Sequence, residues 1–269
     1  MQTIKIHIAA QNGDIQTVEK ELREGVDVNA PDEDGYTALH WACQEGYLQV
    51  VELLLKMEAD VTIRDVDGYH ALEIAASKGH YKVTRALLDN GVDTATSRNG
   101  FTALHAAVAS GNVDVIELLI EFKANVDERD KDGGGRSPLH WAAQEGHLEA
   151  ARILIKNHAQ IDIKDEHGFT PLAVAVPAGH LEFVEFLIRN EANVNARCPS
   201  DGNSTPLHAA CAWGRDEIAE ILIKSGADIN IKDDDGSLPL DIAIEKDNKE
   251  LISLLKESTY KKTKNRKEK

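Results

Sequence analysis

The sequence predicts an all-α fold of stacked repeats, a solenoid, and two observations carry this prediction. A near-copy of one four-residue phrase occurs seven times, with successive copies 32 to 35 residues apart. A second apolar stretch of helical spacing, such as residues 50–55, follows each copy. The copies begin at Thr37, His70, Thr102, Ser137, Thr170, Thr205 and Leu238. Such a chain contacts mainly its neighbouring repeats and does not close around one centre.

The phrase reads Thr-Ala-Leu-His at residues 37–40 and 102–105, and Thr-Pro-Leu-His at residues 205–208. It resembles the Thr-Pro-Leu-His signature of the ankyrin repeat. The resemblance covers nearly the whole chain and implies paired antiparallel helices with β-hairpin-like fingers. Together with a degenerate copy at residues 5–10, it predicts an ankyrin-repeat α-solenoid of about eight repeats, including degenerate end caps.

We expect one solenoid domain over residues 1–257 and a basic, disordered tail over residues 258–269, because the tail is poor in apolar residues. The first to eighth repeats are expected near residues 1–30, 31–63, 64–96, 97–129, 130–163, 164–196, 197–231 and 232–257.

The second repeat illustrates why each element forms. Thr37 is placed to cap a helix over about residues 38–45, and Gly46 supplies the left-handed residue that ends it. A second helix over about residues 48–56 is more apolar than a surface helix, because it packs on its partner helix and on both neighbouring repeats. The residues of the first helix that should face the core are Leu39, Ala42 and Cys43.

Some repeats depart from this pattern. The third has His70 and Glu73 in place of the usual Thr and His, and we expect it to be the least rigid internal repeat. In the sixth, Pro177 lacks an N–H near the end of a first helix, which predicts a bent or shortened turn. Two fingers, at residues 133–136 and 198–204, are each longer by two residues, and insertions of this kind often lie on the binding face.

Charge excludes some partners and favours others. The net charge is −16, although residues 256–269 carry seven basic residues against two acidic ones. The acidic repeats argue against wrapping nucleic acid or lying on an anionic membrane. We therefore expect a protein partner with a basic or mixed basic-apolar surface, no membrane binding, and contact with nucleic acid only through the tail. A solubilising end is the favoured reading of that tail, with a nuclear address as an alternative.

Cysteine content and the chain start bear on location. Three cysteines do not make a disulfide framework, and Cys43 and Cys211 occupy sites where a small buried side chain is expected. Residues 1–13 lack the pattern of a secretory leader, and no stretch approaches 18 apolar residues. We expect a cytoplasmic chain that is monomeric on its own, with the nucleus as an alternative location through the tail.

We predict no catalytic, cofactor or metal site, because no constellation of unlike reactive groups converges. The resemblance implies that a histidine at one site per repeat ties its own finger to the next by hydrogen bonds: His40, His105, His140 and His208. His80, His147 and His180, each after a glycine, are likewise expected to be structural. Residues 233–236 lack the ligand spacing of a calcium loop.

In the ankyrin family the partner usually lies on the concave face, formed by the finger tips and the exposed side of each first helix. Trp213 stands out there, because a Trp at such a place often dominates binding energy. Trp41 and Trp141 sit more inward and are expected to form groove wall or core. The candidate partner-binding residues are Glu33, Asp34, Tyr36, Glu45, Asp67, Tyr69, Lys78, Arg98, Phe101, Arg136, Glu145, His167, Phe169 and Trp213.

The leading hypothesis is a noncatalytic protein–protein interaction module: an adaptor, inhibitor or targeting subunit. One alternative is a substrate or regulator of post-translational modification such as asparagine hydroxylation, for which Asn29, Asn195 and Asn230 match the family's site. Another is a secreted effector of an intracellular bacterium that acts by the same binding mode.

Overall fold

The computed structural model describes residues 2–267 and confirms an all-α repeat solenoid. Within these residues sixteen α-helices follow one another in eight consecutive pairs. The chain divides into two compact bodies, which are described separately. The N-terminal body comprises Met1–Pro138 with Arg152–His158, and the C-terminal body comprises Leu139–Ala151 with Ala159–Lys269. None of the described helices combines the length and the apolar character that a membrane crossing requires.

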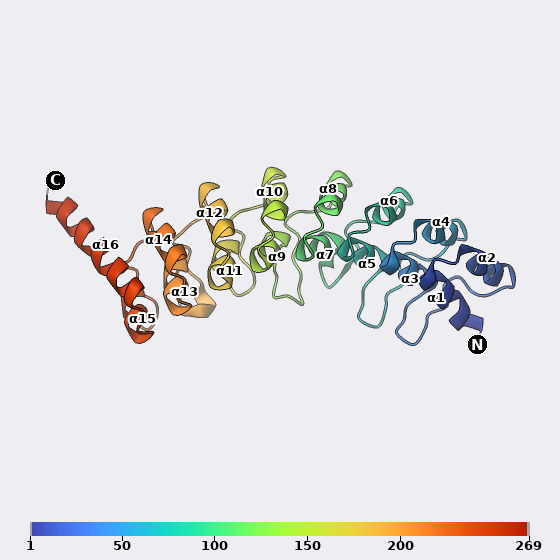
Figure 1. The fold of residues 1–269 in the computed structure, drawn as a ribbon, viewed down its shortest axis with the longest axis horizontal. Coiled ribbons are helices and arrows are strands. Elements are labelled where there is room, and N and C mark those ends of the chain that lie inside the picture. The colour runs from blue at the N-terminus through green and yellow to red at the C-terminus, as the bar shows by residue number, and fades with distance from the viewer. Residues whose placement is uncertain (1, 268–269) are drawn as a thin grey trace. The chain divides into compact units, whose positions relative to one another are not determined.

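The N-terminal body contains the first four helix pairs. In each pair the first helix lies on the side of the fingers and the second helix on the opposite side (Figure 1). The helices are α1 (Gln2–Asn12), α2 (Ile15–Arg23), α3 (Ala38–Glu45), α4 (Leu48–Lys56), α5 (Ala71–Ser77), α6 (Tyr81–Asp89), α7 (Ala103–Ala109) and α8 (Val113–Glu121).

The C-terminal body has the same construction. The fifth pair, α9 (Pro138–Glu145) and α10 (Leu148–Lys156), contains residues of both bodies. The remaining helices are α11 (Pro171–Ala178), α12 (Leu181–Arg189), α13 (Pro206–Ala212), α14 (Asp216–Lys224), α15 (Pro239–Glu245) and α16 (Lys249–Lys267), with a 3₁₀ turn at Pro199–Asp201.

The fingers are tight hairpins whose lengths follow the sequence. In the fourth repeat β1 (Ser97–Arg98) pairs with β2 (Phe101–Thr102) across Asn99 and Gly100, whose φ angles of 47° and 88° give the turn that matches strand twist. The two longer fingers are closed instead by bridges from Asp130 to Arg136 and from Cys198 to Ser204. The two-residue insertions therefore extend finger tips and leave the helices intact.

The caps expected for the second repeat are present. Thr37 precedes α3 in an extended conformation and accepts a hydrogen bond from the His40 backbone N–H, and Gly46 ends the helix with a φ of 80°.

The two helical cysteines are unreactive. Cys43 is fully buried within α3, and burial raises the pKa of its thiol. Burial also raises the pKa of Cys211 to about 12, so both thiols remain protonated and unreactive at neutral pH.

Two local expectations differ from the structure. The α16 helix continues to Lys267, whereas the sequence predicts disorder from residue 258; the stretch 258–267 contains neither Pro nor Gly, so nothing in it interrupts a helix. Residues 268–269 of that tail lie outside the described residues. Pro177 does not shorten α11, which has 8 residues like α3, because the Gly179 backbone N–H still bonds to the Ala175 and Val176 carbonyls and completes the last turn.

Candidate protein-binding face

The finger face of each body consists of its finger loops and the exposed side of its first helices. A frame of buried side chains positions this face. In the N-terminal body His105 shows how: the Thr102 backbone N–H donates to His105 Nδ1 at 3.1 Å, which leaves Nε2 to donate to the carbonyls of Glu128 and Arg136 at 3.1 and 3.2 Å. One imidazole thus joins its own cap to both sides of the next finger.

Burial lowers the pKa of His105 to about 4, outweighing the opposing effect of the carbonyls of Arg136 and Glu128. The ring is therefore neutral at physiological pH, as its hydrogen bonds require. In the C-terminal body His140 and His208 make the same link, from Nε2 to the carbonyls of Phe169 and Ser237 at 2.9 and 3.2 Å. These histidines are structural, as the resemblance implies.

His40 is the exception in this series. Its Nδ1 caps the helix by accepting from the Thr37 backbone N–H at 3.2 Å, but its buried Nε2 has no hydrogen-bond partner of good geometry among the described residues. Burial lowers its pKa, and the Asp65 charge with the nearby carbonyls of Tyr69 and Ile63 partly opposes this effect.

A second set of frame contacts joins the turn between the two helices of one repeat to the end of the first helix of the preceding repeat. His80 Nε2 bonds to the Gln44 carbonyl at 2.9 Å in the N-terminal body, and His180 Nε2 bonds to the Gln144 carbonyl at 2.9 Å in the C-terminal body. Their positions after a glycine, together with these contacts, confirm a structural role. Arg215 fills the same role toward Pro177, donating from Nη2 to its carbonyl at 2.7 Å.

The asparagines considered for modification contribute to the frame as well. Asn29 Oδ1 accepts from the Asp60 backbone N–H at 2.7 Å in the N-terminal body. Asn195 Oδ1 accepts from the Asp228 N–H at 2.8 Å in the C-terminal body. Asn230 instead bonds to Asp228 within its own turn, at 3.1 Å from Nδ2.

The predicted binding residues of the N-terminal body lie on its finger face. Exposed among them are Glu33, Asp34, Glu45, Asp67 and Lys78, and half-buried are Tyr36, Tyr69, Arg98, Phe101 and Arg136. Tyr69, Arg98 and Phe101 are half-buried because their side chains pack on one another across neighbouring fingers.

Aromatic side chains link successive fingers of this body. The rings of Tyr69 and Phe101 meet edge to face with centroids 6.2 Å apart. The Arg98 guanidinium lies 5.2 Å from the Tyr69 ring centroid and 3.4 Å from the Asp132 carboxylate. Trp41 is half-buried and donates from Nε1 to Asp32 Oδ2 at 2.7 Å, consistent with a place in the groove wall.

The finger carboxylates give this face a negative field. The pKa of Tyr36 is raised, first by burial and then by the charges of Asp65, Asp67, Asp32 and Asp34. Several of these carboxylates also close their own turns, as Asp32 Oδ1 does by accepting from the Tyr36 backbone N–H at 2.8 Å. The finger carboxylates therefore both stabilise their own turns and make the finger face negative.

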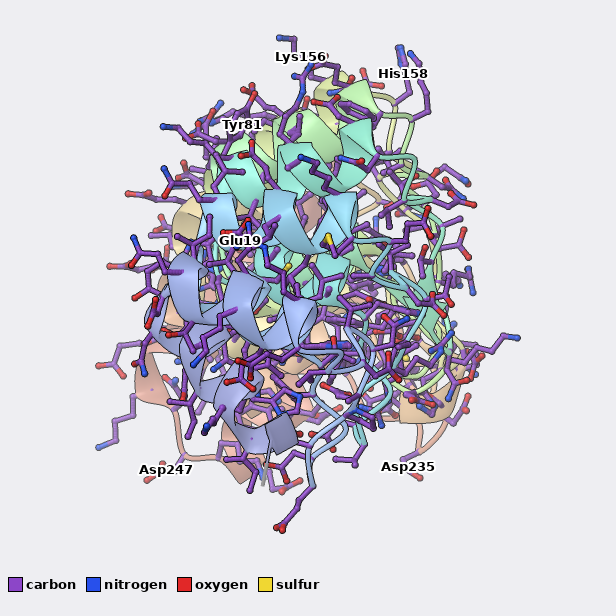
Figure 2. All side chains as sticks on the ribbon, turned by 90° about the vertical axis from the view of Figure 1, so that its right-hand side faces the viewer. Glu19, Tyr81, Lys156, His158, Asp235 and Asp247 are labelled. Carbon is purple, nitrogen blue, oxygen red and sulfur yellow. The ribbon has the colours of Figure 1, made fainter. Side chains whose placement is uncertain are left out.

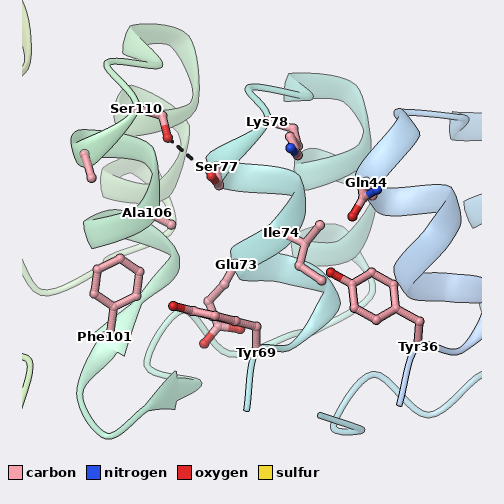
Figure 3. Close-up of a pocket in the computed structure, with 11 residues that line it drawn as sticks. Tyr36, Gln44, Tyr69, Glu73, Ile74, Ser77, Lys78, Phe101, Ala106 and Ser110 are labelled. Atoms are coloured by element: carbon pink, nitrogen blue, oxygen red, sulfur yellow. Dashed lines mark hydrogen bonds between the residues drawn. The ribbon is translucent and has the colours of Figure 1, made fainter. Parts of the chain in front are cut away.

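A cavity of about 320 Å³ opens on this face between the second and fourth repeats (Figure 3). Tyr36, Tyr69 and Phe101 line it from the fingers, as the sequence predicts for the face. Its other lining residues come from the first helices: Gln44, Glu73, Ile74, Ser77, Lys78, Ala106, Ala109 and Ser110.

Sequence reasoning missed Glu73 as a site residue, although it noted the departure at this position. Glu73 Oε2 accepts from the His70 backbone N–H at 2.8 Å and lies 2.9 Å from His70 Nδ1, and both side chains are buried. The pair keeps the geometry of a capping box with different chemistry. The signal was the replacement of Thr and His by two groups that can carry opposite charges.

The C-terminal body places its predicted residues on its own finger face. Glu145 and His167 are exposed, and Phe169 is half-buried with its backbone N–H donating to Asp165 Oδ1 at 2.8 Å. Trp213 is 63% exposed at the end of α13, although it is a large apolar side chain. By contrast, no group of three or more His, Cys, Asp or Glu among the described residues is arranged to hold a metal ion.

Comparison with known proteins identifies the repeat. The family model described as ankyrin repeats (3 copies) matches residues 6–97, 93–165, 125–198, 153–233 and 198–267. The chain belongs to the ankyrin repeat family. This membership agrees with the helix pairs, the fingers and the histidine links described above.

Individual relatives match only part of this ankyrin repeat chain. A stretch of 73 residues is 38% identical to human protein phosphatase 1 regulatory subunit 27, covering 27% of this chain and 46% of that protein. Mouse protein phosphatase 1 regulatory subunit 12A is 40% identical over 78 residues, 29% of this chain and 7% of that protein. Palmitoyltransferase AKR1 of Candida glabrata is 38% identical over 82 residues, 29% of this chain and 11% of that protein. The matches thus span less than half the length of each of these relatives.

Proposed function

We propose that this ankyrin repeat chain is a noncatalytic binding protein, an adaptor, inhibitor or targeting subunit that grips a protein partner on its finger face. The observation that carries the proposal is Trp213, 63% exposed on that face of the C-terminal body. A large apolar side chain held open to water on a rigid helix end is typical of a binding anchor.

The frame supports the same conclusion. The buried Thr–His caps of the second, fourth and seventh repeats have the same bond, whereas the finger residues and the exposed helix ends differ from repeat to repeat. Two relatives are named as regulatory subunits of protein phosphatase 1, which supports a binding role for this chain. The net charge of −16 favours a partner with a basic surface.

Capture of partners from the source cells tests the proposal. The tagged full chain and a Trp213→Ala variant are compared, and the affinity for a captured partner is then measured with purified proteins. We expect the Trp213→Ala change to weaken binding by about 2 kcal/mol or more, with unchanged stability.

Tyr81→Ala is the matched control, because Tyr81 is an exposed aromatic residue on the second helix α6 and projects from the opposite side of its repeat (Figures 1 and 2). It should leave binding unchanged. A partner that tolerates Trp213→Ala and Tyr69→Ala but is lost with Tyr81→Ala would refute the assignment of the finger face.

A further inference from the structure

The cavity on the finger face of the N-terminal body contains a carboxylate whose hydrogen bonding is incomplete. Glu73 is 1% exposed, and its Oε1 has no hydrogen-bond partner among the described residues, while Oε2 is engaged by His70. A buried carboxylate oxygen without a donor costs free energy. One hydrogen-bonding position of this carboxylate is therefore unused in the free chain.

The walls of the cavity suit a positive charge on a flexible apolar stem. The rings of Tyr36, Tyr69 and Phe101 and the side chain of Ile74 line it (Figure 3). Aromatic faces attract cations, and the Tyr69 ring already has the Arg98 guanidinium 5.2 Å from its centroid. The Arg98 charge is offset by the Asp132 carboxylate 3.4 Å away.

The charges around the cavity mouth also favour a cation. Four finger carboxylates act on the Tyr36 hydroxyl and, after burial, raise its pKa. Lys78 is the basic residue of the lining, and its side chain is exposed rather than turned into a buried ion pair. A cation that approaches the cavity is therefore attracted by the finger rim before it reaches Glu73.

We propose that this cavity binds one lysine side chain of the protein partner, with its ammonium on Glu73 Oε1 and its alkyl stem against the aromatic rings. Lysine fits better than arginine, because a guanidinium uses two parallel bonds and Glu73 Oε2 is already occupied by His70. Glu73 Oε1 is closed to water in the free chain, so the lining side chains shift slightly to admit the ammonium. The inference rests on the proposed function and assigns a specificity pocket within the same face.

A small probe tests the pocket without the partner. The full chain is titrated with the peptide acetyl-Gly-Lys-Gly-amide, and the methyl signals of Ile74 are followed by NMR. We expect saturable shifts, with affinity about tenfold or more above that for the norleucine analogue, because the charge-assisted bond is missing in the analogue. Equal affinity for both peptides, or no saturable shift with the lysine peptide, would overturn the proposal.

Two variants test the role of the Glu73 carboxylate in lysine binding separately from its role in the fold. Glu73→Gln should weaken lysine binding by about tenfold or more, and the double variant His70→Thr/Glu73→His should do the same while restoring the capping pair of the second and fourth repeats. Glu52→Gln removes an exposed carboxylate of the second helix α4, outside the finger face, and should change binding less than twofold.

The two proposals fail in different ways. If a partner depends on Trp213 and Tyr69 but binds the His70→Thr/Glu73→His chain with parent affinity, the lysine pocket is refuted and the binding face stands. If the partner ignores all finger-face changes, the proposed function itself is refuted.

Discussion

The first helices of the third and fourth repeats begin with capping boxes of the same geometry that are built from different residues. In the fourth, Thr102 and the neutral ring of His105 satisfy each other, and His105 Nε2 bonds to the next finger. In the third, His70 and Glu73 satisfy each other but leave Glu73 Oε1 without a donor beside a cavity. The same frame position is therefore fully hydrogen-bonded in one repeat and leaves a buried carboxylate oxygen without a partner in its neighbour.

The largest expected change in the free energy of unfolding comes from removing the His105 side chain in the fourth repeat. His105→Ala leaves a void and removes the bonds to the part-buried carbonyls of Glu128 and Arg136, the second of which keeps its bond from the Asp130 backbone N–H. We expect a loss of about 4 kcal/mol in the free energy of unfolding, measured by urea denaturation. His167→Ala, at an exposed histidine, should cost less than about 0.5 kcal/mol. Equal losses in both variants would contradict a frame role for His105.

Acid should weaken the fourth repeat through the same residue. The pKa of His105 is lowered to about 4 in the folded chain and returns to its ordinary value of 6.5 on unfolding. The unfolded state therefore binds more protons between these values, and stability falls as pH drops from 6.5 toward 4, by about 3 kcal/mol. Histidine NMR titration with parallel denaturation checks this, and a His105 ring that protonates near pH 6.5 in the folded chain would contradict it.

Converting the third repeat to the chemistry of the fourth should have the smallest effect. The His70→Thr/Glu73→His chain removes the unsatisfied carboxylate oxygen and keeps a cap, so we expect a gain of about 1 kcal/mol in urea denaturation. A loss of similar size would mean that the His–Glu pair is the better cap in this surrounding.

Much of the frame follows from the sequence, because repetition makes each position visible several times. The period gave the helix pairs, and Thr37 and Gly46 gave the ends of α3. The longer finger at Cys198 to Ser204 followed from a count of residues. These features depend on contacts within one repeat or between neighbouring repeats, and similar residues recur at the equivalent positions of each repeat.

The candidate site was harder to predict, because it depends on which residues surround a position that departs from the repeat pattern. The sequence marks His70 and Glu73 as unusual and predicts low rigidity, whereas the structure shows a retained cap and one unsatisfied oxygen. The Arg215 side chain bonds to the Pro177 carbonyl at the position where His80 and His180 make the corresponding contact in other repeats, although the three side chains are not of one type. Propensity alone does not reveal such pairings.

The central claim is that the finger face, held by a uniform frame, is where a protein partner binds. Hydrogen exchange of the full chain, with and without a purified partner, tests it most directly. The account predicts that protection increases at backbone amides of the fingers near residues 33–36, 66–69 and 98–101 and around Trp213, and stays unchanged along α4, α6 and α14. Protection confined to those second helices, with the fingers unaffected, would contradict it.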